Sequence, residues 1–319
     1  MSLPLDPDSR SGDRQRRARV SPPRLEESAE LALELSCALG ESPVWDARSD
    51  ELVFVDIPPG DLYRWSPAAA RPRRTRLGHS LSAVAPLAPG GYVLATRSGF
   101  AVLDERGDLE LVAAVESDRP GNLMNDGKCD PRGRFWAGTM SATEEPGAGS
   151  LYRLELDGSV TKVVEAVTVS NGLGWSGDGK TMYYVDSLAR GLDAFDFSME
   201  TGDATARRRV VDVPASCGVP DGICVDEQDY IWVALYSGHA LHRYSPEGVL
   251  DARVELPVAL VTSCTFGGPD LRDLYITTGR APGSDEPLAG SVFCYKAAVP
   301  GRPGRECELR VRPPAERTR

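Results

Sequence analysis

A pair of short apolar or alternating runs, joined by a tight turn, recurs six times along this 319-residue chain. The six copies begin at Glu51, Gly91, Arg134, Lys180, Asp229 and Asp273. A further short segment precedes each copy, so each unit supplies three or four strands within roughly 40–50 residues. One such sheet cannot bury both of its faces, whereas a closed ring of them can. The repeat therefore predicts an all-β fold, a six-bladed β-propeller, rather than a β-sandwich or jelly roll, which need no fixed period.

We expect the propeller to occupy residues 31–300, with a tail on either side. Residues 1–30 and 301–319 are rich in Arg and Pro, and we predict that these tails lack stable structure. The one candidate helix is Leu25–Leu35, with acidic residues early in the run, although strand from Glu30 onward is an equal alternative. The N-terminus lacks the apolar core of a secretory signal.

Composition narrows the classes of partner. The net charge of -11 argues against a nucleic-acid partner, because phosphate binding needs clustered Lys and Arg. No apolar run reaches the length of a membrane span. The seven cysteines are odd in number and none has CxxC spacing, which predicts free thiols in a reducing compartment, the cytoplasm. No feature indicates the oligomeric state.

The segment that precedes each strand pair is expected to be the innermost strand of its blade, next to the central channel. These segments open with Glu41, Leu81 or Ser82, Asn125, Asn171, Asp221, and Thr262 or Ser263. Because the positions recur with the blade period, they should form a ring at one end of the channel. For a single Asn or Asp, capping of a turn is an equally good explanation. Glu41 is a poor turn former, and its presence in the same register favours a functional ring.

A ring with two carboxylates and an amide oxygen would suit a hard divalent cation, which offsets the repulsion between the carboxylates. Ca²⁺, Mg²⁺ and Mn²⁺ prefer such ligands, and Zn²⁺ also accepts carboxylates. Three protein ligands would leave coordination positions open for water or substrate, which is typical of a catalytic metal site.

Other catalytic signatures are weak. The chain has only three histidines and no GxSxG, HExxH or Walker A motif. The glycines between Gly172 and Gly177 match GxGxxG, but they do not open a helix after a strand. We therefore interpret them as turn glycines and not as a dinucleotide site.

Six longer motifs lie between Leu39 and Tyr295. They are LGESPVWD (39–46), NDGKCDPRGRFWAGTM (125–140), SNGLGWS (170–176), YYVDS (183–187), PDGICVD (220–226) and TSCTFGG (262–268). Together they resemble the senescence-marker-protein/gluconolactonase/luciferin-regenerating-enzyme-like (regucalcin-like) family, and the combination is far more specific than any one motif.

The resemblance implies a six-bladed propeller with one divalent metal ion that hydrolyses a lactone. It implies that Glu41, Asn171 and Asp221 are the metal ligands, three of the residues that the register argument reached. It also implies that Asn125 contacts the substrate or a metal-bound water, and that Asp221 acts as general base.

The chain departs from the family pattern at two substrate-contact positions. Leu123 stands where regucalcin-like members have a sugar-binding Arg, and Thr143 stands where they have a Glu. Glu144 is a candidate to replace that Glu as a substrate contact, and Arg119 or Arg97 could replace the Arg from a loop. Ordinary surface charge is the alternative for all three. The departures bear on which lactone is accepted and leave the metal ligands unchanged.

We therefore expect a small-molecule substrate, a sugar lactone such as gluconolactone, that is opened to its hydroxy acid. The alternative is a non-catalytic, calcium-binding regulatory propeller. An interaction scaffold ranks third, because a scaffold does not need polar residues in register around a channel.

Overall fold

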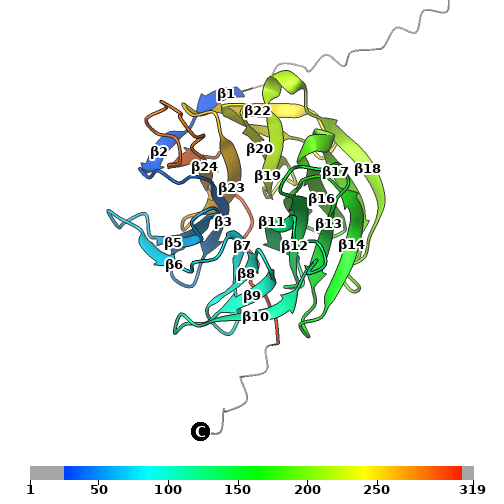
Figure 1. Ribbon diagram of the computed structural model, residues 1–319. Coiled ribbons are helices and arrows are strands. Elements are labelled where there is room, and N and C mark those ends of the chain that lie inside the picture. Colours follow the sequence, from blue (N-terminus) through cyan, green and yellow to red (C-terminus); the bar gives the residue numbers. More distant parts are fainter. Residues whose placement is uncertain (1–24, 311–319) are drawn as a thin grey trace, which may run out of the picture.

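The computed structural model describes residues 25–310, which form six small sheets arranged in a ring around a channel (Figure 1). The predicted six-bladed β-propeller is confirmed. Within the described range the only helical segments are two short 3-10 turns, η1 (Ser187–Ala189) and η2 (Ala215–Cys217). No helix in residues 25–310 is long and apolar enough to cross a membrane.

Blades are numbered in chain order, and each is given from its innermost strand outward. Blade 1 contains β3 (Gly40–Asp46), β4 (Glu51–Asp56), β5 (Asp61–Trp65) and β6 (Arg73–Arg76). Blade 2 contains β7 (Leu81–Pro86), β8 (Tyr92–Thr96), β9 (Gly99–Leu103) and β10 (Leu109–Ala114). Blade 3 contains β11 (Asn122–Cys129), β12 (Phe135–Ser141), β13 (Gly149–Leu154) and β14 (Val160–Val167).

Blade 4 contains β15 (Ser170–Trp175), β16 (Thr181–Asp186), β17 (Gly191–Phe197) and β18 (Ala204–Asp212). Blade 5 contains β19 (Val219–Val225), β20 (Ile231–Tyr236), β21 (Ala240–Tyr244) and β22 (Leu250–Glu255), and β1 (Leu25–Ser28) extends it. Blade 6 contains β23 (Val261–Gly267), β24 (Asp273–Thr278), β25 (Val292–Lys296) and β2 (Glu30–Leu33). All six inner strands run in the same direction, from the end of the channel that we call upper to the end that we call lower.

The N-terminal segment closes the ring. β2 pairs antiparallel with β25, so the last blade is assembled from both ends of the chain, and β1 pairs parallel with β22. The helix considered over Leu25–Leu35 is therefore wrong, and strand from Glu30 onward is confirmed. The open edges of β25 and β22 supply backbone hydrogen bonds that a local helix would leave unused, and this pairing overrides local helix propensity.

The C-terminal segment, residues 301–310, packs across the lower end of the ring. Gly301 N–H donates to Leu271 O of blade 6 (2.7 Å), Cys307 N–H to Pro86 O of blade 2 (2.7 Å), and Glu308 N–H to Gly133 O of blade 3 (2.9 Å). Figure 1 shows this segment, coloured red, passing behind the ring near its centre.

The ordered structure thus extends past the expected limits of 31–300 at both ends, because β1 and residues 301–310 find backbone partners on blades far away in sequence. The rest of the two predicted tails, residues 1–24 and 311–319, lies outside the described residues.

Aromatic clusters fill the spaces between blades. Between blades 3 and 4, Trp136, Trp175 and Phe197 pack with ring centroids 5.8–5.9 Å apart, and Trp136 is fully buried. Edge-to-face aromatic contacts of this kind add to the stabilisation from apolar burial. This packing holds neighbouring blades together and so fixes the spacing of the inner strands around the channel.

Candidate metal centre and active site

The ladder of every inner strand is irregular near its upper end. The register shifts between Glu41 and Val44, Leu81 and Ala83, Met124 and Gly127, Ser170 and Leu173, Pro220 and Ile223, and Val261 and Ser263. A bulge interrupts strict alternation and redirects side chains, and bulges are frequent beside active sites. Glu41, Asn125, Asn171 and Asp221 all lie at or within such irregularities. The fold therefore places the predicted ring residues in bulges rather than in regular strand.

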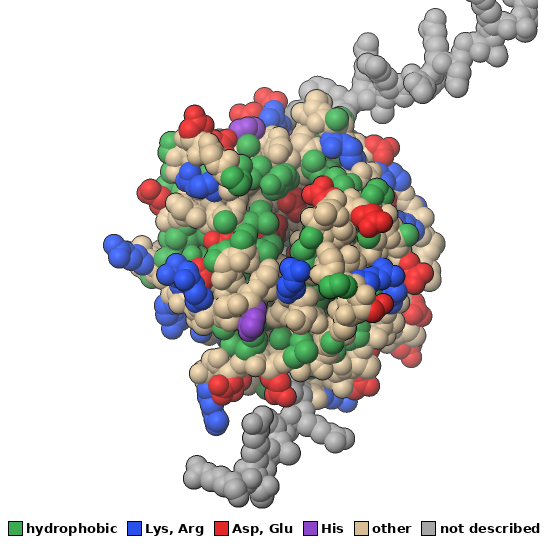
Figure 2. Space-filling model, in the orientation of Figure 1, with side chains coloured by type: hydrophobic (Ala, Val, Ile, Leu, Met, Phe, Trp, Pro, Cys, Tyr) green, Lys and Arg blue, Asp and Glu red, His purple; other side chains and the backbone are tan. Residues whose placement is uncertain are grey.

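At this level the inner strand of blade 5 approaches those of blades 4 and 6 closely. A Cβ atom on Gly172 would lie only 2.6 Å from the carbonyl oxygen of Asp221, and one on Gly222 would lie 2.1 Å from Ser263 Oγ. The inner strands converge here because glycine follows both Asn171 and Asp221. Figure 2 shows acidic side chains in the hollow at the centre of the upper face.

The three predicted metal ligands are buried, at 6% exposure for Glu41, 5% for Asn171 and 7% for Asp221. Ser42 N–H donates to Glu41 Oε2 (2.7 Å), and Asn171 Nδ2 donates to Ser187 Oγ (3.0 Å). Among the described residues, Asn171 Oδ1 and Asp221 Oδ1 are buried acceptors with no hydrogen-bond partner. Buried polar atoms are normally satisfied, so these oxygens indicate a site for a ligand.

The electrostatics of the centre also favour a bound ligand, specifically a cation. Burial, followed by the charges of Asp221 and Asp126, raises the pKa of Glu41 well above its ordinary value. Burial and the charge of Asp126 likewise raise the pKa of Asp221, although the Asn171 amide and the Gly222 N–H oppose this shift. Ionised carboxylates this close together repel one another, and a bound cation would relieve their repulsion.

The donor set fits a hard divalent cation. In residues 25–310 no group of three or more His, Cys, Asp or Glu side chains is arranged to hold a metal ion, and the predicted set instead combines two carboxylates with the Asn171 amide. Two carboxylates and one amide oxygen suit Ca²⁺, Mg²⁺ or Mn²⁺ better than metals that prefer nitrogen or sulfur.

Sequence reasoning missed Asp126, which lies beside this set. Asp126 is only 4% exposed, and Gly127 N–H donates to its Oδ1 (2.7 Å), while its Oδ2 has no partner in the described part of the chain. Lys128 Nζ donates to Ile223 O (2.5 Å), and its charge partly offsets the rise in the pKa of Asp126 that burial causes. Strict alternation would place Asn125 and Asp126 on opposite faces, and the bulge in β11 removes that restriction.

The predicted substrate contacts lie around the upper mouth. Asn125 is half-buried, and its Nδ2 donates to Ser170 O (2.8 Å), which leaves its Oδ1 free to accept. Glu144 is exposed on the turn after β12, with a left-handed backbone (φ 55°). Tyr236, which sequence reasoning also missed, lies at the upper end of β20; burial and then the charges of Asp221 and Glu144 raise its pKa. Tyr236 therefore lies within electrostatic reach of both Asp221 and Glu144.

The other positions considered from the sequence are occupied by local contacts. Half-buried Leu123 pairs with Met140 across β11 and β12. Thr143 Oγ1 lies 3.0 Å from Ser141 Oγ. Arg119 Nη1 donates to Ala148 O (3.0 Å), and Arg97 Nη2 donates to Pro120 O (3.3 Å). Both arginines thus contact the backbone of the rim in this structure.

Comparison with known proteins gives a consistent result. The sequence pattern of the family described as the SMP-30/Gluconolactonase/LRE-like region matches residues 39–280. Regucalcin of Xenopus laevis is 41% identical over 268 residues, which cover 80% of this chain and 89% of that protein. Human regucalcin is 39% identical over 277 residues, which cover 83% of this chain and 92% of that protein.

Solved structures agree with these sequence matches. A protein from Agrobacterium tumefaciens, described as a calcium-binding regucalcin, aligns with a TM-score of 0.85 at 31% identity over 89% of this chain and 99% of its own. A luciferin-regenerating enzyme aligns with a TM-score of 0.83 at 31% identity, over 88% of this chain and 99% of its own. A gluconolactonase from Xanthomonas campestris, at 20% identity and a TM-score of 0.70 over 89% of this chain and 99% of its own, shares the fold.

Proposed function

Because this chain belongs to the SMP-30/gluconolactonase/LRE-like family, we propose that it is a divalent-metal-dependent hydrolase that opens a lactone to its hydroxy acid. The first candidate substrate is a sugar lactone such as gluconolactone. One observation carries the proposal: at the mouth of the channel, Asn171 and Asp221 each have a buried oxygen without a partner in the described residues, and the buried carboxylate of Glu41 lies within electrostatic reach of Asp221. Such a set can hold a cation and still leave coordination positions open for a substrate.

In this proposal Glu41, Asn171 and Asp221 hold the cation. When bound, the ion supplies Lewis acidity, which polarises the lactone carbonyl and stabilises negative charge on its oxygen. Ser187 keeps the Asn171 amide oriented so that its oxygen faces the centre. Asn125 orients the lactone from blade 3, and Glu144 and Tyr236 contact its outer part at the rim.

Asp221 acts as general base. Its carboxylate removes a proton from the attacking water as the water oxygen bonds to the carbonyl carbon. The ring carbon–oxygen bond then breaks, and the ring oxygen receives a proton and becomes the hydroxyl group of the product. The product carboxylic acid loses a proton to solvent near neutral pH, so turnover can be followed as acid release.

The alternative is a calcium-binding regulatory propeller without turnover. The names of the regucalcin relatives and the description of the Agrobacterium tumefaciens protein as calcium-binding favour it. The same three ligands would serve either function. The seven free cysteines support a location in the reducing cytoplasm for both.

The deciding experiment begins with chelator-treated protein and follows acid release from a panel of sugar and aliphatic lactones. Ca²⁺, Mg²⁺, Mn²⁺ and Zn²⁺ are added back one at a time, and binding of each ion is measured in parallel by calorimetry. We expect one ion to restore hydrolysis. Tight binding of Ca²⁺ without hydrolysis of any lactone would instead support the regulatory alternative.

A further inference from the structure

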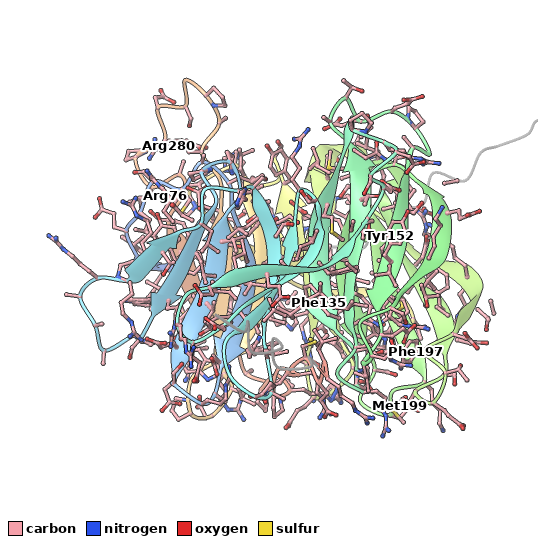
Figure 3. The ribbon with its side chains drawn as sticks, turned by 60° about the horizontal axis from the view of Figure 1, so that its bottom comes forward. Arg76, Phe135, Tyr152, Phe197, Met199 and Arg280 are labelled. Carbon is pink, nitrogen blue, oxygen red and sulfur yellow. The ribbon has the colours of Figure 1, made fainter. Side chains whose placement is uncertain are left out.

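A cavity of about 160 Å³ extends through the lower part of the channel, from Ser42 and Asp126 below the predicted metal centre to the C-terminal segment. Its walls include the lower halves of the inner strands and the C-terminal segment, and we call it the lower cavity. Asp126, Lys128, Trp175, Met199, Arg302 and Arg305 are among its lining residues. Figure 3 shows Met199 at the end of the propeller opposite Arg280 and Arg76. The lower cavity therefore opens on the face that the proposed reaction does not use.

Trp175, which lines this cavity, has an unused hydrogen-bond donor. Its side chain is only 8% exposed, and its Nε1 is a buried donor without an acceptor in residues 25–310. Among the other buried tryptophans, Trp136 and Trp232 donate to Asp130 (3.0 Å) and Asp226 (3.1 Å), and Trp65 Nε1 donates to Ala69 O (2.9 Å). An indole N–H can only donate, so the group that satisfies Trp175 must be an acceptor.

One basic side chain at the cavity has no acidic partner among the described residues. At the inner end, Lys128 lies within electrostatic reach of Asp126. At the outer end, Arg302 Nη1 pairs with Asp229 Oδ1 (3.0 Å). Arg305 is exposed beside them and forms no ion pair within the described part of the chain. The lower cavity thus combines an unpaired guanidinium with an unpaired indole donor.

The C-terminal segment positions these groups. Arg302 also donates to the carbonyl oxygens of Asp226 (2.8 Å) and Glu227 (2.7 Å), which fixes the segment against blade 5. On the other side of the channel, the Cys307 N–H donates a backbone hydrogen bond to Pro86 O of blade 2. Arg305 lies between these two anchors, and its backbone is therefore held at the rim of the cavity.

We propose that the lower cavity binds a small oxyanion, a carboxylate or a phosphate, through Arg305 and Trp175. An oxyanion supplies the acceptor atoms that the indole lacks and the negative charge that matches the guanidinium. The volume is similar to the cavity of about 150 Å³ that holds benzene in another protein, so the ligand is small. The proposal does not depend on lactone hydrolysis, because it uses neither the metal ligands nor the upper mouth.

The test is calorimetric titration of the full chain with sodium phosphate and, separately, sodium acetate, in a chloride-free buffer. The two titrations distinguish a phosphate site from a carboxylate site. We expect saturable one-site binding of at least one anion, with the same affinity before and after the upper centre is loaded with metal.

Two variants locate the site, and a third serves as a matched control. Arg305→Gln and Trp175→Phe should each weaken binding about tenfold, because each removes one charge-assisted hydrogen bond. Arg310→Gln removes an exposed Arg from the same segment outside the cavity, and it should bind like the unmodified protein. Thermal unfolding checks folding, and the exposed Arg305 variant remains decisive if Trp175→Phe perturbs the aromatic cluster.

Three results would overturn the proposal. The first is the absence of saturable binding for both anions. The second is equal affinity in the Arg305→Gln and Arg310→Gln variants, which would indicate general surface binding. The third is loss of anion binding in Glu41→Gln but not in Arg305→Gln, which would place the anion at the upper mouth.

Discussion

Two aspartates near opposite ends of the inner strand of blade 5 have opposite surroundings. Asp226, just below the strand, is completely buried and accepts hydrogen bonds from Trp232 Nε1 (3.1 Å), Arg243 Nε (2.8 Å) and the backbone N–H groups of Gln228 (2.9 Å) and Tyr230 (3.1 Å). Asp221, near its upper end, is almost as deeply buried, yet its Oδ1 has no partner among the described residues. The first carboxylate is satisfied by the fold, whereas the second requires a ligand.

The same contrast holds on blade 3. Asp130 accepts from Trp136 Nε1 (3.0 Å) and Arg134 Nε (2.6 Å), while Asp126, four residues earlier, keeps an oxygen without a partner in residues 25–310. Burial alone therefore does not separate structural from functional carboxylates in this propeller. The two kinds differ in hydrogen bonding: a structural carboxylate has partners for its oxygens, whereas a functional one keeps an oxygen without a partner.

The largest effect is expected at Asp226. Asp226→Ala leaves Arg243 buried without its main partner, so the free energy of unfolding should fall by about 3–5 kcal/mol. Chemical denaturation measures this loss, with the exposed Asp178→Ala as control. A change below about 1 kcal/mol would contradict a structural role for this carboxylate.

Asp221→Ala should reduce activity without reducing stability. We expect turnover of the best lactone to fall on the order of 10³-fold, because the general base and a metal ligand are lost together. The chelated variant should unfold at the same or a higher temperature than the chelated parent, since one of the repelling carboxylates is gone. Substantial metal-dependent turnover in this variant would exclude the assigned role.

A smaller effect is expected from Ser187→Ala. The Ser187 hydroxyl accepts from Asn171 Nδ2 and so orients the amide oxygen toward the centre. Loss of such a supporting contact typically weakens metal affinity 10-fold or more, and we expect about tenfold here. Calorimetric metal titration gives the affinity, and Ser159→Ala on an exposed turn is the control. Unchanged affinity would show that the amide needs no support.

The smallest effect concerns pH. The pKa values of Glu41 and Asp221 are raised in the folded protein, so the folded state binds more protons than the unfolded state above about pH 4. The stability that protonation confers is complete below the unfolded pKa values and is lost as pH rises through the folded ones. We expect the Tm of chelated protein to fall with rising pH over that window, and bound metal to flatten the curve. A chelated Glu41→Gln variant with an unchanged slope would refute this origin.

The blade repeat and the register of Glu41, Asn125, Asn171 and Asp221 could be derived from the sequence. Both are local patterns: the strand pairs recur at a fixed spacing, and equivalent positions of repeated units must occupy equivalent places in a ring. Their roles as ligands, base and substrate contact remain predictions that the experiments above address.

Other features required the tertiary structure, because they depend on contacts between residues far apart in the chain. Leu25–Leu35 has a helical composition, but the free edges of β25 and β22 draw it into strands. Asp126 reaches the centre through a bulge, and a period-two pattern does not reveal bulges. Arg305 reaches the lower cavity because backbone hydrogen bonds carry the C-terminal segment from blade 6 to blades 2 and 3. Repetition along the chain determined the ring, and pairing across it decided which carboxylates were left without partners.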